Sequence, residues 1–274
     1  MENCSVLSGW ITGCHKQGVE RAGKFCRPGE ATDTITARIT GEAYMKADSR
    51  IKALLVIVFG LLASGGTVRG ADPLEADPTH HKLEFENPHF RVDRGFFGPG
   101  EIAADFFDAE GVVIVALTPM RMRLHLPDGK FVDPPPAPAG AAFWAPPGKI
   151  RPENLLDQRL EFVIVIPRGD NGASKLVGAD ALVVDPDHWK AEIDNDAVRA
   201  LRYRGDPRAK GVMHGHAAHV VVFLTSAKTL IDQPGGKTFI SVRKKGDAIS
   251  VPAGEHAPEN LLDEPVEVIL LERK

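Results

Sequence analysis

Residues 246–260 read GDAISVPAGEHAPEN, and an earlier stretch, residues 211–219, reads GVMHGHAAH. Alternate side chains of a β-strand point to the same face, so His214 and His216 are expected to lie side by side. His256 could join them from a neighbouring strand. Because imidazole nitrogens are common ligands of divalent transition metals, this spacing predicts a metal site built from two strands.

The later stretch belongs to a segment that occurs twice in the chain. Residues 146–157 read PPGKIRPENLLD, and residues 252–263 read PAGEHAPENLLD. Two further pairs are DPTH at residue 77 with DPDH at residue 185, and LPDGK at residue 126 with QPGGK at residue 233. The three offsets are 106 residues (146 to 252), 108 residues (77 to 185) and 107 residues (126 to 233). A register that holds across three blocks indicates a tandem duplication.

Each copy is predicted to consist of β-strands. Short runs rich in Val and Ile are bounded by Gly, Pro and Asp, and they occupy residues 112–117, 162–166, 220–224 and 266–271. The chain contains 27 Gly and 21 Pro, which favours a turn-rich β protein over a helical one. Residues 182–184 are predicted to begin a strand of the second copy. A sandwich or a barrel is the expected architecture.

The segment 45–70 is typical of a secretory signal. It begins with the basic sequence MKADSRIK, continues with an apolar run over residues 53–66, and ends in small residues before Ala71. The apolar run is shorter than the about 20 residues that span a bilayer. We therefore expect a periplasmic or secreted protein whose mature form has no stable membrane span. An uncleaved anchor and a buried helix are the alternatives.

Residues 1–44 differ from the rest of the chain. They show no sustained periodicity and contain all three cysteines, Cys4, Cys14 and Cys26. We interpret them as a disordered or non-native extension, with Met45 as the true start. A cysteine metal site or disulfide is the alternative, although the cysteine spacings fit no zinc pattern and their number is odd.

The two histidine stretches resemble the motifs of the cupin superfamily. The second cupin motif contains a glycine, a proline, a glycine, a histidine and an asparagine in this order, and the chain supplies them as Gly246, Pro252, Gly254, His256 and Asn260. The first cupin motif contains a His-x-His pair followed by a glutamate. The chain supplies the pair as His214 and His216.

The first motif departs from the family in two respects. Gly211 lies only three residues before His214, and Val220 and Val221 stand where the glutamate is expected. His219 is a candidate substitute ligand. Its parity differs from that of the His-x-His pair, so it could reach the site only if the strand bends at residues 217–218.

The resemblance implies an all-β bicupin, with two tandem double-stranded β-helix, or jelly-roll, barrels. The expected barrels are residues 71–169 and residues 185–274, joined by a linker over residues 170–184. The N-terminal barrel is expected to lack a metal site, because Ile150 stands at the position of His256 and residues 104–112 replace the histidine segment. We interpret this barrel as a structural partner.

The resemblance further implies one divalent transition metal (Fe, Mn, Ni, Cu or Zn), with His214, His216, His219 and His256 as ligands and Asn260 in support. Four neutral ligands leave the charge of the ion uncompensated, which favours an anionic ligand. The expected function is a metal-dependent dioxygenase, oxidase or isomerase acting on a small molecule. A non-catalytic small-molecule-binding, metal-binding or structural module is the alternative.

Other features of the sequence limit the partners and the mechanism. The net charge of −4 offers no support for a nucleic-acid partner. Glu255 is the acid nearest to His256 in sequence, but strand parity is expected to turn it away, so no general base is identified. A homo-oligomer is compatible with the resemblance. Arg202 and Arg204 are interpreted as part of a solvated face, with binding of an anionic substrate as the alternative.

Overall fold

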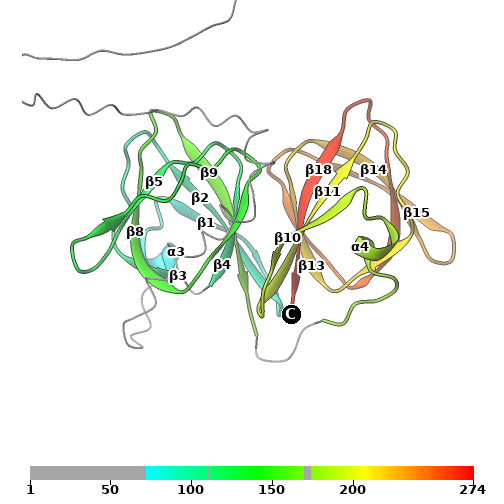
Figure 1. Cartoon of the computed structure of the whole chain (residues 1–274), viewed down its shortest axis with the longest axis horizontal. Coiled ribbons are helices and arrows are strands. Elements are labelled where there is room, and N and C mark those ends of the chain that lie inside the picture. The colour runs from blue at the N-terminus through cyan, green and yellow to red at the C-terminus, as the bar shows by residue number, and fades with distance from the viewer. Residues whose placement is uncertain (1–71, 110, 170–173) are drawn as a thin grey trace, which may run out of the picture. The chain divides into compact units, whose positions relative to one another are not determined.

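The computed structural model describes residues 72–109, 111–169 and 174–274. Almost all regular elements in these residues are β-strands, which confirms the all-β expectation (Figure 1). The N-terminal barrel consists of α3 (Pro73–Ala76), β1 (His81–Glu86), β2 (Phe90–Phe97), β3 (Phe107–Ala109), β4 (Val112–Ala116), β5 (Met122–His125), β6 (Phe131–Val132), β7 (Ala142–Ala145), β8 (Gly148–Asn154) and β9 (Leu160–Pro167). The C-terminal barrel consists of α4 (Ala181–Val184), β10 (Trp189–Asp194), β11 (Val198–Gly205), β12 (His214–His216), β13 (His219–Phe223), β14 (Ala227–Gln233), β15 (Lys237–Arg243), β16 (Ala248–Val251), β17 (Gly254–Asn260) and β18 (Val266–Arg273).

Each barrel is made of two antiparallel sheets with the same strand order. In the N-terminal barrel the orders are β1-β2-β9-β4-β7 and β3-β8-β5-β6. In the C-terminal barrel they are β10-β11-β18-β13-β16 and β12-β17-β14-β15. The second pair of orders repeats the first element by element, so the duplication read from the sequence is a duplication of the whole topology. From β2 to β5 and from β6 to β9 consecutive strands alternate between the two sheets, and the equivalent strands of the C-terminal barrel do the same, which is the jelly-roll arrangement.

The central strands of the five-stranded sheets are buried on both faces, which explains their unbroken apolar sequences. On β13, Val221 and Phe223 pack inside the C-terminal barrel, whereas Val220 and Val222 belong to a second core. That second core also contains Val163 and Val165 of β9, so it joins the five-stranded sheets of the two barrels. Side chains on one face of β13 therefore fill the C-terminal barrel, and those on the other face pack against the N-terminal barrel.

Equivalent arginines of the two barrels make matching hydrogen bonds across the junction between the barrels. Nη2 of Arg94 donates to the backbone oxygen of Gly246 at 2.6 Å, and Nη2 of Arg202 donates to that of Gly140 at 2.6 Å. Arg202 also contacts Glu192 and Glu267, and its side chain is only 7% exposed. Arg202 is therefore part of the barrel junction, and its interpretation as part of a solvated face was wrong.

The second barrel begins differently from the prediction. Residues 182–184 belong to the short helix α4 and not to a strand. Asp180 decides this outcome, because its side chain accepts a hydrogen bond from the backbone N–H of Leu182 at the start of the helix. Asp72 caps α3 in the same way, by accepting from Leu74. The helix is thus part of the repeated unit.

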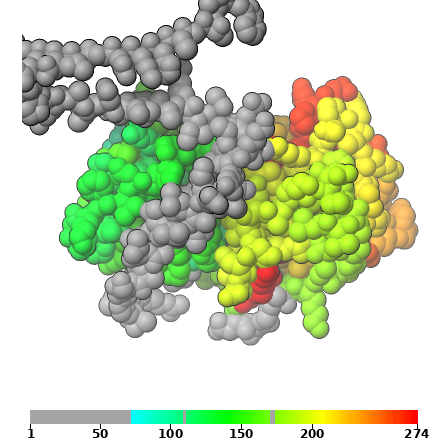
Figure 2. Space-filling model, viewed as in Figure 1, coloured from blue at the N-terminus to red at the C-terminus, as the bar shows by residue number. Residues whose placement is uncertain are grey.

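The outer edge of the four-stranded sheet in the C-terminal barrel is β15. Its turn with β14 lies in the orange region at the margin of this barrel in Figure 2. Phe239, Ile240 and Val242 on β15 are each at least half exposed.

Among the residues that the structure describes, no helix has the length and apolar character needed to cross a bilayer. The predicted signal segment 45–70, the extension 1–44 and its three cysteines lie outside the described residues.

Candidate metal centre

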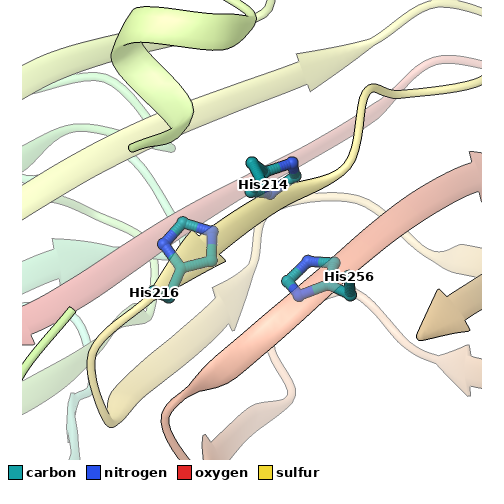
Figure 3. A group of neighbouring side chains, drawn as sticks. All are labelled: His214, His216 and His256. Atoms are coloured by element: carbon teal, nitrogen blue, oxygen red, sulfur yellow. The ribbon is translucent and has the colours of Figure 1, made fainter. Parts of the chain in front are cut away.

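Three of the four predicted histidine ligands converge inside the C-terminal barrel. Strand β12 pairs with β17 so that His214 lies directly opposite His256, and His216 lies opposite Gly254. One potential ligand atom from each of His214, His216 and His256 lies within 4.8 Å of the others. Figure 3 shows the three rings gathered over this pair of strands. The strand periodicity read from the sequence thus places the His-x-His pair correctly.

Hydrogen bonds orient the rings of the His-x-His pair. Nδ1 of His214 lies 2.7 Å from the backbone oxygen of Val212, and Nδ1 of His216 lies 3.0 Å from Oε1 of Glu272. Both oxygens act as acceptors, so Nδ1 carries the proton and Nε2 presents its lone pair. Nε2 of each ring is buried without a hydrogen-bond partner. Two orphaned lone pairs in a buried histidine group fit a metal ion, which would satisfy both.

The environment keeps these imidazoles neutral. Burial lowers the pKa of His216 to about 3, with a further contribution from His214. Burial likewise lowers the pKa of His256 to about 3 and that of His219 to about 4, and the neighbouring histidines add to both shifts. The pKa of His214 is also lowered by burial. Since only a neutral imidazole can bind a metal, the four rings are in the required form at neutral pH.

Gly215, which lies between the paired histidines, allows residues 177–180 to lie against β12. These residues belong to the segment that connects the two barrels, here called the connecting segment. The N–H of Gly215 donates to the backbone oxygen of Ala179 at 2.7 Å, and Gly215 forms a parallel bridge with Asp180. A Cβ atom on Gly215 would lie 1.6 Å from the backbone oxygen of Val177. Any larger residue would therefore displace the connecting segment from the back of the site.

His219 reaches the barrel interior from the other sheet. Strand β12 ends at His216, and β13 begins at His219, so the chain changes sheet at residues 217–218, where a bend was predicted. The rings of His216 and His219 lie 4.9 Å apart, centroid to centroid. Nδ1 of His219 is 2.7 Å from the backbone oxygen of Ala217. His219 is buried beside the group of three but is not one of the three whose ligand atoms lie within 4.8 Å of one another.

Two residues beside the histidines were missed by the sequence analysis. The ring of Trp189 lies 5.2 Å from that of His214 and 5.1 Å from that of His216, and it forms one wall of the site. Glu272 on β18 lies opposite His219 in the strand register and contacts His216. Burial raises the pKa of Glu272, while nearby Arg199 opposes this shift. The buried acid directly after the apolar run at residues 268–271 was the available signal.

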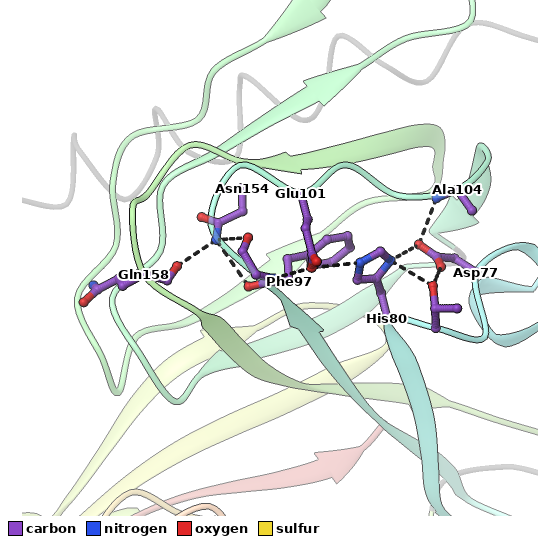
Figure 4. Close-up of polar contacts among 9 residues, drawn as sticks. Asp77, His80, Phe97, Glu101, Ala104, Asn154 and Gln158 are labelled. Carbon is purple, nitrogen blue, oxygen red and sulfur yellow. Dashed lines mark hydrogen bonds and ion pairs between the residues drawn. The ribbon is translucent and has the colours of Figure 1, made fainter.

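The predicted supporting residue, Asn260, organises a turn. Its Nδ2 donates to the backbone oxygens of Asp206 and Glu264, and its Oδ1 accepts from the N–H of Leu262. Asn154 makes equivalent bonds in the N-terminal barrel, including one to Gln158 (Figure 4). The same turn is therefore built in both barrels, with and without histidine ligands. These hydrogen bonds of the Asn260 side chain connect it to the turn and not to the four histidines.

The N-terminal barrel has an apolar group where the C-terminal barrel has histidines. Strand β3 pairs with β8 so that Phe107 lies opposite Ile150, in the register that joins His214 to His256. Phe107, Ile150 and Val112 all belong to the core of this barrel. Core side chains of the first barrel therefore occupy the positions that His214 and His256 have in the second.

A buried histidine remains in the apolar interior of the N-terminal barrel. His81 is 3% exposed, packs against Phe107, and has no hydrogen-bond partner at either ring nitrogen. Its neighbour His80 bridges Asp77 and Glu101, with nitrogen–oxygen distances of 2.7 and 3.1 Å (Figure 4). The second barrel repeats the first of these contacts between His188 and Asp185. The repeated Asp-Pro-x-His sequence thus anchors the start of each barrel.

Comparison with solved structures finds a cupin domain and oxalate decarboxylases among the matches. A cupin domain from Bordetella pertussis is 28% identical over 31% of this chain and 91% of its own length, with a TM-score of 0.30. An oxalate decarboxylase from Lactobacillus farciminis, in a formate complex, is 11% identical over 78% of this chain and 88% of its own, with a TM-score of 0.48. Bacillus subtilis oxalate decarboxylase, described with Mn(II) centres, is 13% identical over 77% and 78%, with a TM-score of 0.46. No family model and no curated protein matches the chain.

The topology of the chain itself decides the family of folds. Two jelly-roll barrels repeat one strand order, and the His-x-His strand of the second lies beside the strand of His256. The fold is that of a bicupin.

Residues 246–260 of this bicupin match the second cupin motif less closely than the sequence analysis assumed. Only Glu255 separates Gly254 from His256, which is one residue fewer than the second cupin motif has, so that match is not complete. The register of β17 nevertheless brings His256 opposite His214. Glu255 lies opposite Gly215, and its side chain contacts the connecting segment at Gly178. As predicted from parity, it points away from the histidines of this bicupin.

Proposed function

We propose that this bicupin binds one divalent transition metal ion in its C-terminal barrel and uses it to bind or transform a small molecule. The ligands are His214, His216 and His256, with His219 as a fourth. The observation that carries the proposal is the pair of buried, unpartnered Nε2 atoms on His214 and His216. Leaving two such atoms unsatisfied is costly in a protein interior, and a metal ion removes that cost.

The ligand set determines what a bound ion could do. Three or four imidazoles suit Fe, Mn, Ni, Cu or Zn and leave the double positive charge on the ion uncompensated by its ligands. An anionic oxygen ligand is therefore favoured at the remaining coordination positions. A metal in this state acts as a Lewis acid toward substrate oxygen. We propose a metal-dependent oxidoreductase of the dioxygenase or oxidase type, or an isomerase, for this reason.

A non-catalytic binding module is the second candidate. Its specific support is the direction of Glu255, which lies on the side of the connecting segment and leaves no acid from β17 facing the ring group. Enzymatic proton transfer would then depend on the substrate or on a metal-bound water. The module is favoured if the metal-loaded protein binds small anions without turnover.

The metal is tested by elemental analysis of protein purified under anaerobic conditions, before and after reloading with each of the five metals. The double variant His214→Ala/His256→Ala is expected to lose stoichiometric metal. His125→Ala is the matched control, because His125 contacts Glu153 in the N-terminal barrel. Full metal retention in the double variant would overturn the proposal. An oxygen-uptake screen of the loaded protein then separates an oxygenase or oxidase from an isomerase or a non-catalytic module.

Export is part of the same proposal and rests on the sequence alone. The segment 45–70 supports it by its basic start, apolar run and small-residue end. The test is the N-terminal residue of the protein recovered from its own cells and from their surroundings. A mature N-terminus near Ala71 supports export, whereas an intracellular protein that begins at Met1 contradicts it.

A further inference from the structure

The C-terminal barrel contains an acid that the N-terminal barrel replaces with an apolar residue. Strands β9 and β18 are equivalent, and Glu272 of β18 stands where β9 has Ile166. Ile166 packs in the core of its barrel. Glu272 is 5% exposed and instead lies 3.0 Å from Nδ1 of His216. The acid thus occurs only in the barrel that contains the histidine group.

A charged network holds Glu272 in place. Oε2 of Glu272 lies 3.6 Å from Nη1 of Arg199, and Oε1 accepts from the N–H of Ala217 at 3.3 Å. Arg199 forms two bonds of 2.6 Å with Asp180, which also caps α4. The carboxylate is therefore fixed from two sides while it faces the imidazole.

One part of this network is present in both barrels, and another part is present only beside the histidines. The N-terminal barrel keeps the arginine and the capping acid as Arg91 and Asp72, with 2.7 Å between Nη2 and Oδ1. There the second acid is Asp93, on the same strand as Arg91. In the C-terminal barrel Leu201 replaces Asp93, and the second acid has moved to Glu272. Asp–Arg pairing thus belongs to the fold, whereas Glu272 belongs to the histidine site.

We propose that Glu272 is a positioning residue that selects the tautomer and ring orientation of His216 and supplies the negative charge that the His-x-His segment lacks. A carboxylate can only accept from Nδ1–H, so Nε2 of His216 is left as a lone pair directed at the metal. The proposal rests on the metal site proposed above. Glu272 contacts the nitrogen of His216 that does not face the metal, and it lies on the last strand, β18. In the first cupin motif the acid would instead stand at residues 220–221.

Two substitutions separate the roles of charge and geometry. Glu272→Gln keeps an acceptor oxygen and removes the charge. Glu272→Ile removes both and installs the residue that the N-terminal barrel accommodates at the equivalent position. Glu267→Gln is the matched control on the same strand, because Glu267 contacts Arg202 at the barrel junction. Any loss of affinity that arises from general destabilisation appears in this control as well.

The first measurement is made on metal-free protein. Long-range ¹H–¹⁵N correlation spectra report which ring nitrogen of His216 is protonated. The wild type and Glu272→Gln are expected to carry the proton on Nδ1, and Glu272→Ile is expected to show a mixture of both tautomers. An unchanged Nδ1–H tautomer in Glu272→Ile would overturn the proposal. Because no metal is present, this result stands even if the metal proposal fails.

The second measurement is zinc affinity by competition with a chromophoric chelator. Removing such a supporting partner typically weakens metal binding by about 10–100-fold. We expect losses in this range for both Glu272 variants, larger for Glu272→Ile, and none for Glu267→Gln. The cobalt(II) absorption spectrum should change in the Glu272 variants and not in the control. Wild-type affinity and spectrum in both Glu272 variants would show that the acid is only structural.

Discussion

His214 and His256 are direct register partners across β12 and β17, and their ring centroids lie 4.7 Å apart. They are separated by 42 residues in sequence, so the strand pairing alone brings them together. Phe107 and Ile150 occupy the same register in the other barrel and form part of its core. One backbone arrangement therefore supports either a histidine group or an apolar core, and the side chains decide which is formed.

The contribution of His219 to metal binding can be ranked against that of His256. Because His256 is one of the three residues whose ligand atoms lie within 4.8 Å, His256→Ala is expected to abolish stoichiometric binding. His219 approaches from the other sheet, so His219→Ala should retain binding at an affinity weakened by about tenfold, roughly 1.4 kcal/mol. Chelator competition measures both values. Equal losses in the two variants would place His219 among the primary ligands.

The buried His81 predicts a pH-dependent loss of stability in the N-terminal barrel. Burial lowers the pKa of His81 to about 4, below its ordinary value of 6.5. The unfolded chain therefore takes up the proton first as pH falls. Above about pH 6.5 protonation of His81 does not affect the unfolding free energy. Between about pH 6.5 and 4 the unfolding free energy falls by about 1.4 kcal/mol per pH unit, and below about pH 4 this group causes no further loss.

His81→Leu tests this dependence. Between pH 7 and pH 5 the wild type should lose about 2 kcal/mol more unfolding free energy than the variant. At pH 7 the variant should be more stable by about 1–2 kcal/mol, because two buried nitrogens without partners are removed. Urea denaturation of metal-free protein at both pH values provides the data. Parallel losses in the two proteins would show that His81 is not the titrating group.

The junction between the barrels should depend on Arg202 far more than on Arg204. Arg202 is buried and contacts Glu192, Glu267 and the backbone of Gly140. Its removal leaves two partly buried acids without their main partner, so Arg202→Ala should lower the unfolding free energy by about 1–3 kcal/mol.

Arg204→Ala is the matched control for the junction. Arg204 also contacts Glu267, but its side chain is 50% exposed. Exposed ion pairs contribute little, and a loss below about 1 kcal/mol is expected. Chemical denaturation compares the two variants under the same conditions. A loss in Arg204→Ala as large as that in Arg202→Ala would refute the assignment of Arg202 to the junction.

Local periodicity and internal repetition were enough to predict much of this protein. Alternation along a strand placed His214 and His216 on one face, and the repeat alignment showed that Ile150 replaces His256 in the first barrel. Parity also predicted that Glu255 turns away and that the chain bends at residues 217–218. These features follow from the two-residue period of a strand, which can be read within a few residues.

Features that depend on contacts between distant strands needed the tertiary structure. Glu272 lies 56 residues from His216 in sequence, and only the pairing of β13 with β18 brings the acid beside the histidines. Arg202 has the same alternating pattern as a solvated residue, yet it is buried against Gly140 of the N-terminal barrel. The sequence by itself determined the duplicated β architecture and the primary histidines, because both are encoded in local spacing. The tertiary structure decided which acid faces the histidines and which charges are buried, because strand register and barrel packing bring distant segments together.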